Sequence, residues 1–361
     1  YDPLTRRLTL TGGTIDAIST CTIQIAVISS SAGSYQNCIQ SGALTNAEGA
    51  TNDLACDTLT VADLVNPPTI TKSFLTDPVI VGATSPLQFT ITNPNSTTLT
   101  GIGFTDLLPV GLVVATPPNV TQCNGTLTTA VDVDTSRDLI TLTGGNIAAN
   151  SSCTVTVGTK AAVGGVYNNE TGNVTSTEGG SGNPASDTLT VIAPPIIAKA
   201  FNLAEITRGA TSTLTITVTN PAENTVALTG ISFTDTFPAG VKAIEPPNVF
   251  ISPNCGSPTF ALQTNDTTLS FSNGTIQPAS TGNNVCTVQV DVTAVNGGVF
   301  NNVTGKVNST NGGQGTTASA TLTANGVGLS LSKSTATSYY SAIGNIIVYD
   351  YLLTNTGTAV L

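Results

Sequence analysis

Three sets of residues recur at matching places along the chain and carry groups that could react with one another or bind a partner. Each set has one residue type: Lys72, Lys199 and Lys333; Asp106 and Asp235; Asn37, Asn169 and Asn302. Lysine is rare here, since Lys and Arg together number 10 in 361 residues, so three lysines at one aligned position are unusual. An amine and a side-chain amide can condense where apolar surroundings deprotonate the amine and keep a nearby acid protonated.

Two interpretations of these sets are open. In the first, each complete copy forms a lysine–asparagine amide bond with the aspartate as the acid, through Lys72, Asn169 and Asp106, then Lys199, Asn302 and Asp235. In the second, simpler interpretation, the lysine protects a strand edge or binds an acid at a domain junction, and the asparagine bonds a turn. Strand residues alternate between two faces, so Lys72 should share the face of Phe74 and point inward if Phe74 is buried.

The seven cysteines are typical of an exported protein, in which they form disulfides. Three bridges are expected from the alignment of the copies and from strand adjacency: Cys123–Cys153, Cys255–Cys286 and Cys38–Cys56. Cys21 aligns with Cys153, and its partner would lie in the part of its own copy that this segment lacks. The sequence contains neither Cys-x-x-Cys nor histidine, so we expect no metal site.

Asparagine glycosylation is permitted at a set of Asn-x-Ser/Thr sequons: Asn95, Asn119, Asn124, Asn150, Asn169, Asn173, Asn265, Asn273, Asn302 and Asn308. Chance alone gives almost this number in a chain so rich in Ser and Thr. The sequons therefore allow covalent glycans where the host has the machinery, and sugars on Thr hydroxyls are equally allowed.

Composition excludes several classes of function. A net charge of −11 argues against nucleic acid as a partner, because nucleic-acid binding needs clustered Lys and Arg. The absence of histidine removes imidazole bases and imidazole metal ligands. No run of ~18 apolar residues occurs, so no membrane span is expected in this segment. We expect no enzyme activity and no cofactor.

The elements that must position these residues come in copies of about 130 residues. The strings Cys-Thr-Ile-Gln-Ile (21–25), Cys-Thr-Val-Thr-Val (153–157) and Cys-Thr-Val-Gln-Val (286–290) mark three of them. The predicted division is a partial repeat over 1–64, complete repeats over 65–192 and 193–325, and a partial repeat over 326–361. We expect a segment of a longer array. The alternative is that neighbouring chains complete the partial repeats by strand donation.

Within a copy the pattern is that of β-strands. Residues 87–92, 153–157 and 214–218 alternate apolar and polar side chains, and no apolar stripe of helical period and length occurs. The proline pairs at 67–68 and 194–195 stand where copies join and favour stiff, extended links. We therefore predict an all-β protein of tandem immunoglobulin-like, two-sheet β-sandwiches in a rod-like array.

Residues 92–112, Thr-Asn-Pro-Asn-Ser-Thr-Thr-Leu-Thr-Gly-Ile-Gly-Phe-Thr-Asp-Leu-Leu-Pro-Val-Gly-Leu, together with 354–361, Thr-Asn-Thr-Gly-Thr-Ala-Val-Leu, carry a family resemblance. They resemble the signature of the conserved Ig-like tandem repeat of large bacterial cell-surface and extracellular filament proteins. The resemblance covers nearly the whole chain. It implies an exported, multi-copy protein of the cell surface or of a filament, and it implies no ligand.

The leading functional hypothesis is a structural one: an extracellular filament or cell-surface fibre in which copies of the chain associate head to tail or laterally. The stalk of a bacterial adhesin, which would present a separate binding tip, is the alternative. A carbohydrate-binding module or an enzyme is disfavoured, because the chain has no Trp and aromatic residues make up 5% of it.

Overall fold

The computed structural model describes residues 8–62, 64–115, 120–121, 123–132, 134–262, 267–336, 339, 342–357 and 360. In this part of the chain the regular structure is β-strand, apart from the short 3-10 helices η1 (Pro253–Cys255) and η2 (Ala279–Thr281). Neither has the length or the apolar character that a membrane crossing requires. The contacts divide the chain into two compact units, Tyr1–Val65 and Asn66–Leu361. The predicted all-β class is confirmed.

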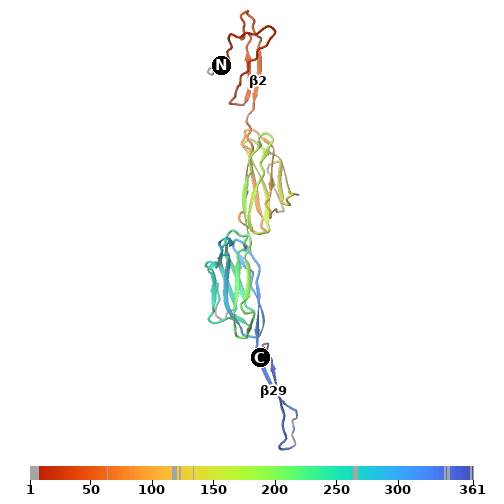
Figure 1. The fold of residues 1–361 in the computed structure, drawn as a ribbon, viewed down its shortest axis with the longest axis vertical. Coiled ribbons are helices and arrows are strands. Elements are labelled where there is room, and N and C mark those ends of the chain that lie inside the picture. Colours follow the sequence, from red (N-terminus) through yellow and green to blue (C-terminus); the bar gives the residue numbers. More distant parts are fainter. Residues whose placement is uncertain are drawn as a thin grey trace. The chain divides into compact units, whose positions relative to one another are not determined.

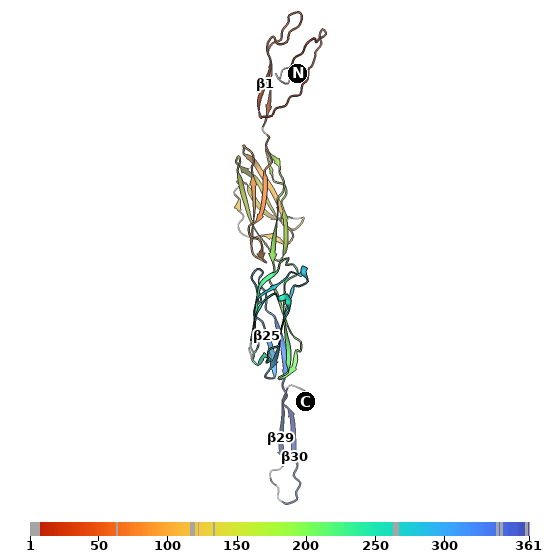
Figure 2. The same ribbon diagram turned by 90° about the vertical axis from the view of Figure 1, so that its left-hand side faces the viewer.

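The first unit contains a β-hairpin made of β1 (Gly33–Ile39) and β2 (Ala55–Val61), which pair antiparallel. Figure 2 labels β1, and Figure 1 labels β2. The register places Cys38 directly opposite Cys56. Apolar side chains of this hairpin, such as Tyr35 and Leu59, are exposed.

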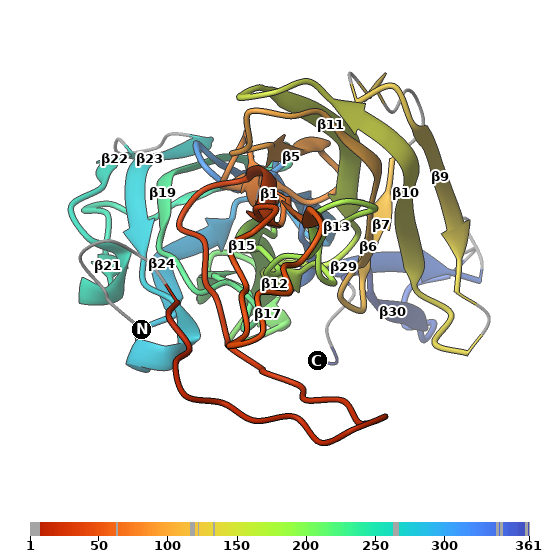
Figure 3. The same cartoon turned by 90° about the horizontal axis from the view of Figure 1, so that it is seen from above.

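Residues 66–192 form the first complete β-sandwich. Its strands are β3 (Thr69–Phe74), β4 (Val79–Ile80), β5 (Ser85–Thr92), β6 (Leu99–Leu107), β7 (Leu112–Val114), β8 (Val120–Thr121), β9 (Thr126–Val131), β10 (Asp138–Ile147), β11 (Ser152–Ala161), β12 (Gly165–Glu170), β13 (Thr175–Ser176), β14 (Gly180–Ser181) and β15 (Ser186–Ile192). One sheet has the order β14-β13-β6-β10-β9, and the neighbours β10 and β9 are labelled in Figure 3. A second sheet has the order β3-β5-β11-β7 with β8 beside β11, and a third has the order β12-β15-β4.

Residues 193–325 repeat this plan. The strands are β16 (Ile196–Phe201), β17 (Glu205–Thr207), β18 (Thr211–Thr219), β19 (Leu228–Thr236), β20 (Val241–Ala243), β21 (Val249–Ile251), β22 (Thr259–Ala261), β23 (Thr268–Ile276), β24 (Val285–Ala294), β25 (Gly298–Val303), β26 (Asn308–Ser309), β27 (Gly313–Gln314) and β28 (Ser319–Asn325). The sheet orders are β22-β23-β19-β26-β27, β16-β18-β24-β20 with β21 beside β24, and β17-β28-β25. Strand for strand, β16, β19 and β25 take the places of β3, β6 and β12.

Period-two alternation creates the core. Along β5, Leu87, Phe89 and Ile91 are buried, whereas the residues between them are partly exposed. Each such side chain contributes roughly 1.5–3 kcal/mol of burial free energy. The ring of Phe89 lies 4.8 Å from that of Phe104 on the facing strand β6, so the two layers are in direct contact.

The chain changes sheet at the end of β12. Asn169 still pairs with β15, but Thr171 forms an isolated bridge with Asp106 of β6, and Thr175 pairs with Gly103 of β6. The second complete repeat changes sheet in the same way after β25. In the described residues each sandwich has three hydrogen-bonded sheets rather than the two expected, since the β12-β15-β4 sheet, like its counterpart β17-β28-β25, is not paired with its neighbours. The change of sheet at the end of β12 brings Asn169 beside the residues of β6.

The last strands, β29 (Leu329–Thr335) and β30 (Tyr349–Asn355), form an antiparallel hairpin, labelled in Figure 2. All their residues are exposed.

Candidate functional site

Lys72 points into the first complete repeat. Strand β3 alternates exposed and buried residues, and Ile70, Lys72 and Phe74 form its buried face, as the shared parity predicts. The side chain of Lys72 has no exposed surface, and its Nζ lies 5.4 Å from the centre of the Phe89 ring. The interpretation of Lys72 as a charge that protects a strand edge is therefore wrong.

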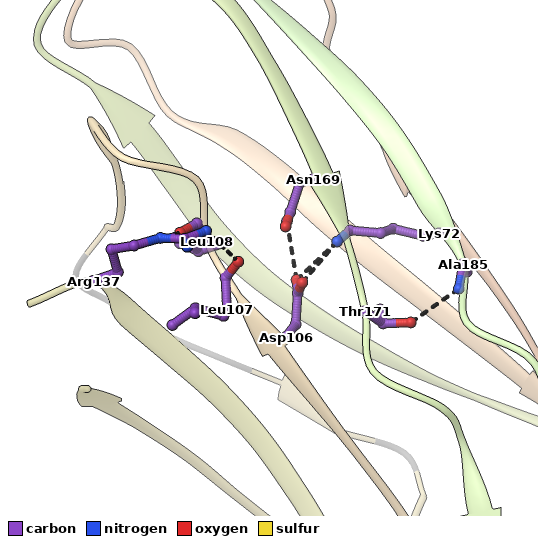
Figure 4. A network of polar contacts seen from close by, with 8 residues as sticks. All are labelled: Lys72, Asp106, Leu107, Leu108, Arg137, Asn169, Thr171 and Ala185. Carbon is purple, nitrogen blue, oxygen red and sulfur yellow. Dashed lines mark hydrogen bonds and ion pairs between the residues drawn. The ribbon is translucent and has the colours of Figure 1, made fainter. Parts of the chain in front are cut away.

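Asp106 and Asn169 meet Lys72 from two other strands, β6 and β12 (Figure 4). Lys72 Nζ donates hydrogen bonds to both Asp106 carboxylate oxygens, at 2.9 Å each. Asn169 Nδ2 donates to Asp106 Oδ2 at 3.0 Å. Asp106 is fully buried and Asn169 is 2% exposed. One buried carboxylate thus holds the amine and the amide together. The lysine binds an acid, as part of the simpler interpretation expects, but it does so in the interior of the repeat, and Asn169 does not serve a turn.

Burial shifts the two ionisable groups toward their neutral forms. Desolvation lowers the pKa of Lys72 below its ordinary value, although the attraction of Asp106 works against this. Desolvation likewise raises the pKa of Asp106, against the attraction and hydrogen bond of Lys72. The charged pair and its neutral form, an amine beside a carboxylic acid, therefore differ less in free energy here than they would in water.

The second complete repeat holds the same three groups. Lys199 Nζ donates to Asp235 Oδ1 at 2.6 Å, and Asn302 Nδ2 donates to Asp235 Oδ2 at 3.1 Å. The side chains of Lys199 and Asp235 have no exposed surface. Burial lowers the pKa of Lys199 as it does that of Lys72. We call the two groups of three the Lys–Asp–Asn triads.

One atom in each triad lacks a partner. Asn169 Oδ1 and Asn302 Oδ1 are buried without a hydrogen-bond partner, and in the described residues the one other buried side-chain atom in this condition is Thr293 Oγ1. A buried acceptor left unpaired costs about 1–3 kcal/mol. The missing hydrogen bond occurs at equivalent positions of two repeats, so it is a feature of the triad rather than an isolated defect.

The remaining aligned residues, Lys333 and Asn37, lie outside any triad. Lys333 is exposed on β29, where its Nζ lies 3.9 Å from the centre of the Tyr349 ring. Asn37 is exposed on β1, opposite Asp57. In the part of the chain that the structure describes, the three groups come together in the two complete repeats.

The three expected cysteine pairs are disulfide-bonded in the structure. The Cα atoms are 5.1 Å apart in Cys123–Cys153, 4.6 Å in Cys255–Cys286 and 4.1 Å in Cys38–Cys56. Cys21 is an exposed free cysteine. In the described residues no group of three or more His, Cys, Asp or Glu side chains is arranged to hold a metal ion.

Burial separates the sequons. Asn95, Asn169 and Asn302 are buried, so the structure contradicts their candidacy as glycan acceptors in the folded protein. Asn308 is half-buried. The exposed candidates are Asn124, Asn150, Asn173 and Asn273, and the remaining two, Asn119 and Asn265, lie outside the described residues.

A second buried polar cluster escaped the sequence analysis. Asn93, which is fully buried, donates from Nδ2 to the carbonyls of Thr97, Ile147 and Ala148, at 2.7–3.1 Å. Its Oδ1 accepts hydrogen bonds from the backbone and side-chain nitrogens of Asn95.

Asn95 in turn holds the backbone of Asn66, where the first complete repeat begins. Asn224 and Asn220 do the same at Ala193 in the second repeat. Asn93 and Asn220 stand at equivalent positions of the two repeats, but their partners follow after two residues in one copy and after four in the other.

Comparison with known proteins gives a family match. The family described as "Domain of unknown function (DUF7933)" matches residues 5–61, 68–191 and 195–324. These ranges lie within the first three predicted repeats. None of the curated proteins compared with the chain is significantly similar to it.

Among solved structures, similar chains include domains of three bacterial proteins. The C-terminal domain of the AgI/II polypeptide BspA of Streptococcus agalactiae is 13% identical, with 71% of this chain and 100% of that chain covered and a TM-score of 0.41. The corresponding domain of the antigen I/II-family protein AspA of Streptococcus pyogenes is 12% identical, with 72% and 100% covered and a TM-score of 0.43. The collagen adhesin CNA of S. aureus is 11% identical, with 81% and 97% covered and a TM-score of 0.27.

Proposed function

The chain belongs to the DUF7933 domain family, and we propose that it is a non-enzymatic structural component of an extracellular filament or cell-surface fibre. The observation that carries the proposal is the repetition of one internal plan. Two complete repeats in tandem bury the same Lys–Asp–Asn triad and close the same disulfide. A disulfide and a buried ion pair at the same place in each repeat tie its strands together, which supports a structural role.

The location of the reactive groups supports a non-enzymatic role. The lysine and aspartate side chains of both triads have no exposed surface, so a dissolved substrate could not reach them in the folded protein.

The disulfides support an extracellular setting, because structural disulfides persist in oxidising compartments and are rare in reducing ones. The low charged fraction, 9%, supports contact between copies, since few ions must be desolvated when two such surfaces meet. We propose copies of the same chain as partners, joined head to tail or laterally. Covalent glycans on the exposed asparagines are compatible with this arrangement.

The test is electron microscopy of material shed from cells that make the protein, labelled with an antibody against the chain. We expect antibody along the length of polymers that have a regular repeat. Isolated flexible rods of varied length, each with a distinct tip, would instead support the adhesin stalk. Label confined to the interior of the cell would contradict both.

A further inference from the structure

The Lys–Asp–Asn triads are arranged for a covalent bond as well as for an ion pair. In the first complete repeat the carboxylate of Asp106 contacts the Lys72 amine at 2.9 Å and the Asn169 amide nitrogen at 3.0 Å (Figure 4). In the second, Asp235 contacts the corresponding groups at 2.6 Å and 3.1 Å. In each triad, one carboxylate therefore contacts both the amine that could act as nucleophile and the nitrogen that would leave the amide.

We propose that each triad forms an intramolecular isopeptide bond, Lys72 with Asn169 and Lys199 with Asn302, with Asp106 and Asp235 carrying the protons. A new bond joins lysine Nζ to asparagine Cγ, and the Cγ–Nδ2 bond breaks. The leaving nitrogen takes one proton, which the amine gives up, and departs as ammonia. An amine and a primary amide thus become a secondary amide and ammonia. Nothing is oxidised or reduced, and no external reactant is needed.

A single proton transfer converts the ion pair into the neutral amine and neutral acid that the reaction needs. One proton moves from Lys72 Nζ to the Asp106 carboxylate along the 2.9 Å contact. Burial favours this transfer, because desolvation lowers the pKa of the amine and raises the pKa of the acid. The neutral amine is the nucleophile, and the neutral acid can protonate the leaving nitrogen, which already lies beside it.

The unpaired oxygen supports the same product. Asn169 Oδ1 is buried without a partner while Asp106 is ionised, because a carboxylate has no proton to donate. After condensation Asp106 is a neutral acid, and its hydroxyl can donate to this oxygen. Asn302 Oδ1 and Asp235 stand in the same relation. Condensation also removes the buried amine and carboxylate charges, which are costly to keep in a protein interior.

The bond would link strands of different sheets. Lys72 is on β3 and Asn169 is on β12, roughly 100 residues later in the chain, so the cross-link closes a loop that contains most of the repeat. This inference does not depend on the proposed filament, because it concerns the inside of a single repeat. A chain that never polymerises would carry the bonds all the same.

The test is the intact mass of the full chain after reduction and alkylation of its cysteines. Two isopeptide bonds remove two molecules of ammonia, so the measured mass should lie about 34 Da below the mass calculated for the sequence with all its cysteines alkylated. Proteolysis with trypsin should leave Lys72 uncleaved and yield a branched peptide that contains both Lys72 and Asn169. A folded chain with all three disulfides and the full sequence mass would overturn the proposal.

Single variants use the second repeat as an internal control. Asp106→Asn should halve the deficit to about 17 Da, because the triad of the second repeat remains intact. Asn173→Ala, at an exposed asparagine, should leave the whole deficit. Formation of Cys123–Cys153 in the Asp106→Asn protein shows that the first repeat still folds. An undiminished deficit in that variant would overturn the role of Asp106.

Discussion

Removal of the Cys123–Cys153 disulfide tests quantitatively how the complete repeats are stabilised. The bridge closes a loop of 30 residues between the segment that precedes β9 and the start of β11. With this length, the chain-entropy relation gives about 3.6 kcal/mol of stabilisation, because the reduced unfolded chain has more conformations to lose on folding. In a domain of about 130 residues this corresponds to a fall in Tm of roughly 10–15 °C.

The assay is calorimetry of the double variant Cys123→Ala/Cys153→Ala in the full chain under oxidising conditions. Faster hydrogen exchange in peptides from β5 then shows that the loss of stability is in the first complete repeat. The equivalent variant Cys255→Ala/Cys286→Ala closes a loop of nearly equal length, 31 residues, so it should lower the Tm of the second repeat by a similar amount. A shift under about 2 °C in either variant would refute the reasoning that these bridges limit the unfolded state.

Three further predictions follow from the complete repeats. Asn93→Ala should lower the free energy of unfolding by about 2–4 kcal/mol, since it removes the donor to three carbonyls and the acceptor for two Asn95 nitrogens inside the repeat, whereas Asn173→Ala should change it by less than about 0.5 kcal/mol; urea titration of both variants distinguishes these values. Hydrogen bonds from Thr100 hold the pKa of Glu178 below its ordinary value of 4.5, so the stability that this contact provides is present above pH 4.5 and is lost as the pH falls through the lowered pKa. NMR titration should show this low pKa and its return toward 4.5 in Thr100→Val, and an unchanged pKa in that variant would contradict the assignment. In a host that glycosylates asparagine, glycopeptide mapping should find sugar at some of the exposed sequons Asn124, Asn150, Asn173 and Asn273, and a glycan on Asn95, Asn169 or Asn302 in folded material would contradict their burial.

Much of the fold follows from local pattern. The alternation over residues 87–92 fixes which side chains of β5 face the core, because successive strand residues point to opposite faces. The same parity argument correctly placed Lys72 with Phe74. The cysteine pairs could be predicted because equivalent residues recur one repeat apart, and a bridge within each copy is the simplest way to satisfy that recurrence.

The polar clusters were harder to predict. Asn95 and Asn224 hold equivalent backbone positions, but their different distances from Asn93 and Asn220 hide them from an alignment. The loop after Asn93 is shorter than the loop after Asn220, yet the asparagine on each loop reaches the equivalent backbone group. The spacing in the sequence therefore differs although the contact is the same. The sequons at Asn169 and Asn302 misled for a related reason, because a three-residue motif contains no information on burial.

The sequence by itself determined that this protein is all-β, that it repeats, which cysteines pair, and which lysine, aspartate and asparagine types recur at each copy. These properties depend on residue type and spacing along one strand or one repeat. Only the tertiary structure decided that Lys72, Asp106 and Asn169 meet in a closed interior. That meeting depends on the point after β12 where the chain leaves one sheet for another, and so on contacts between segments far apart in the sequence.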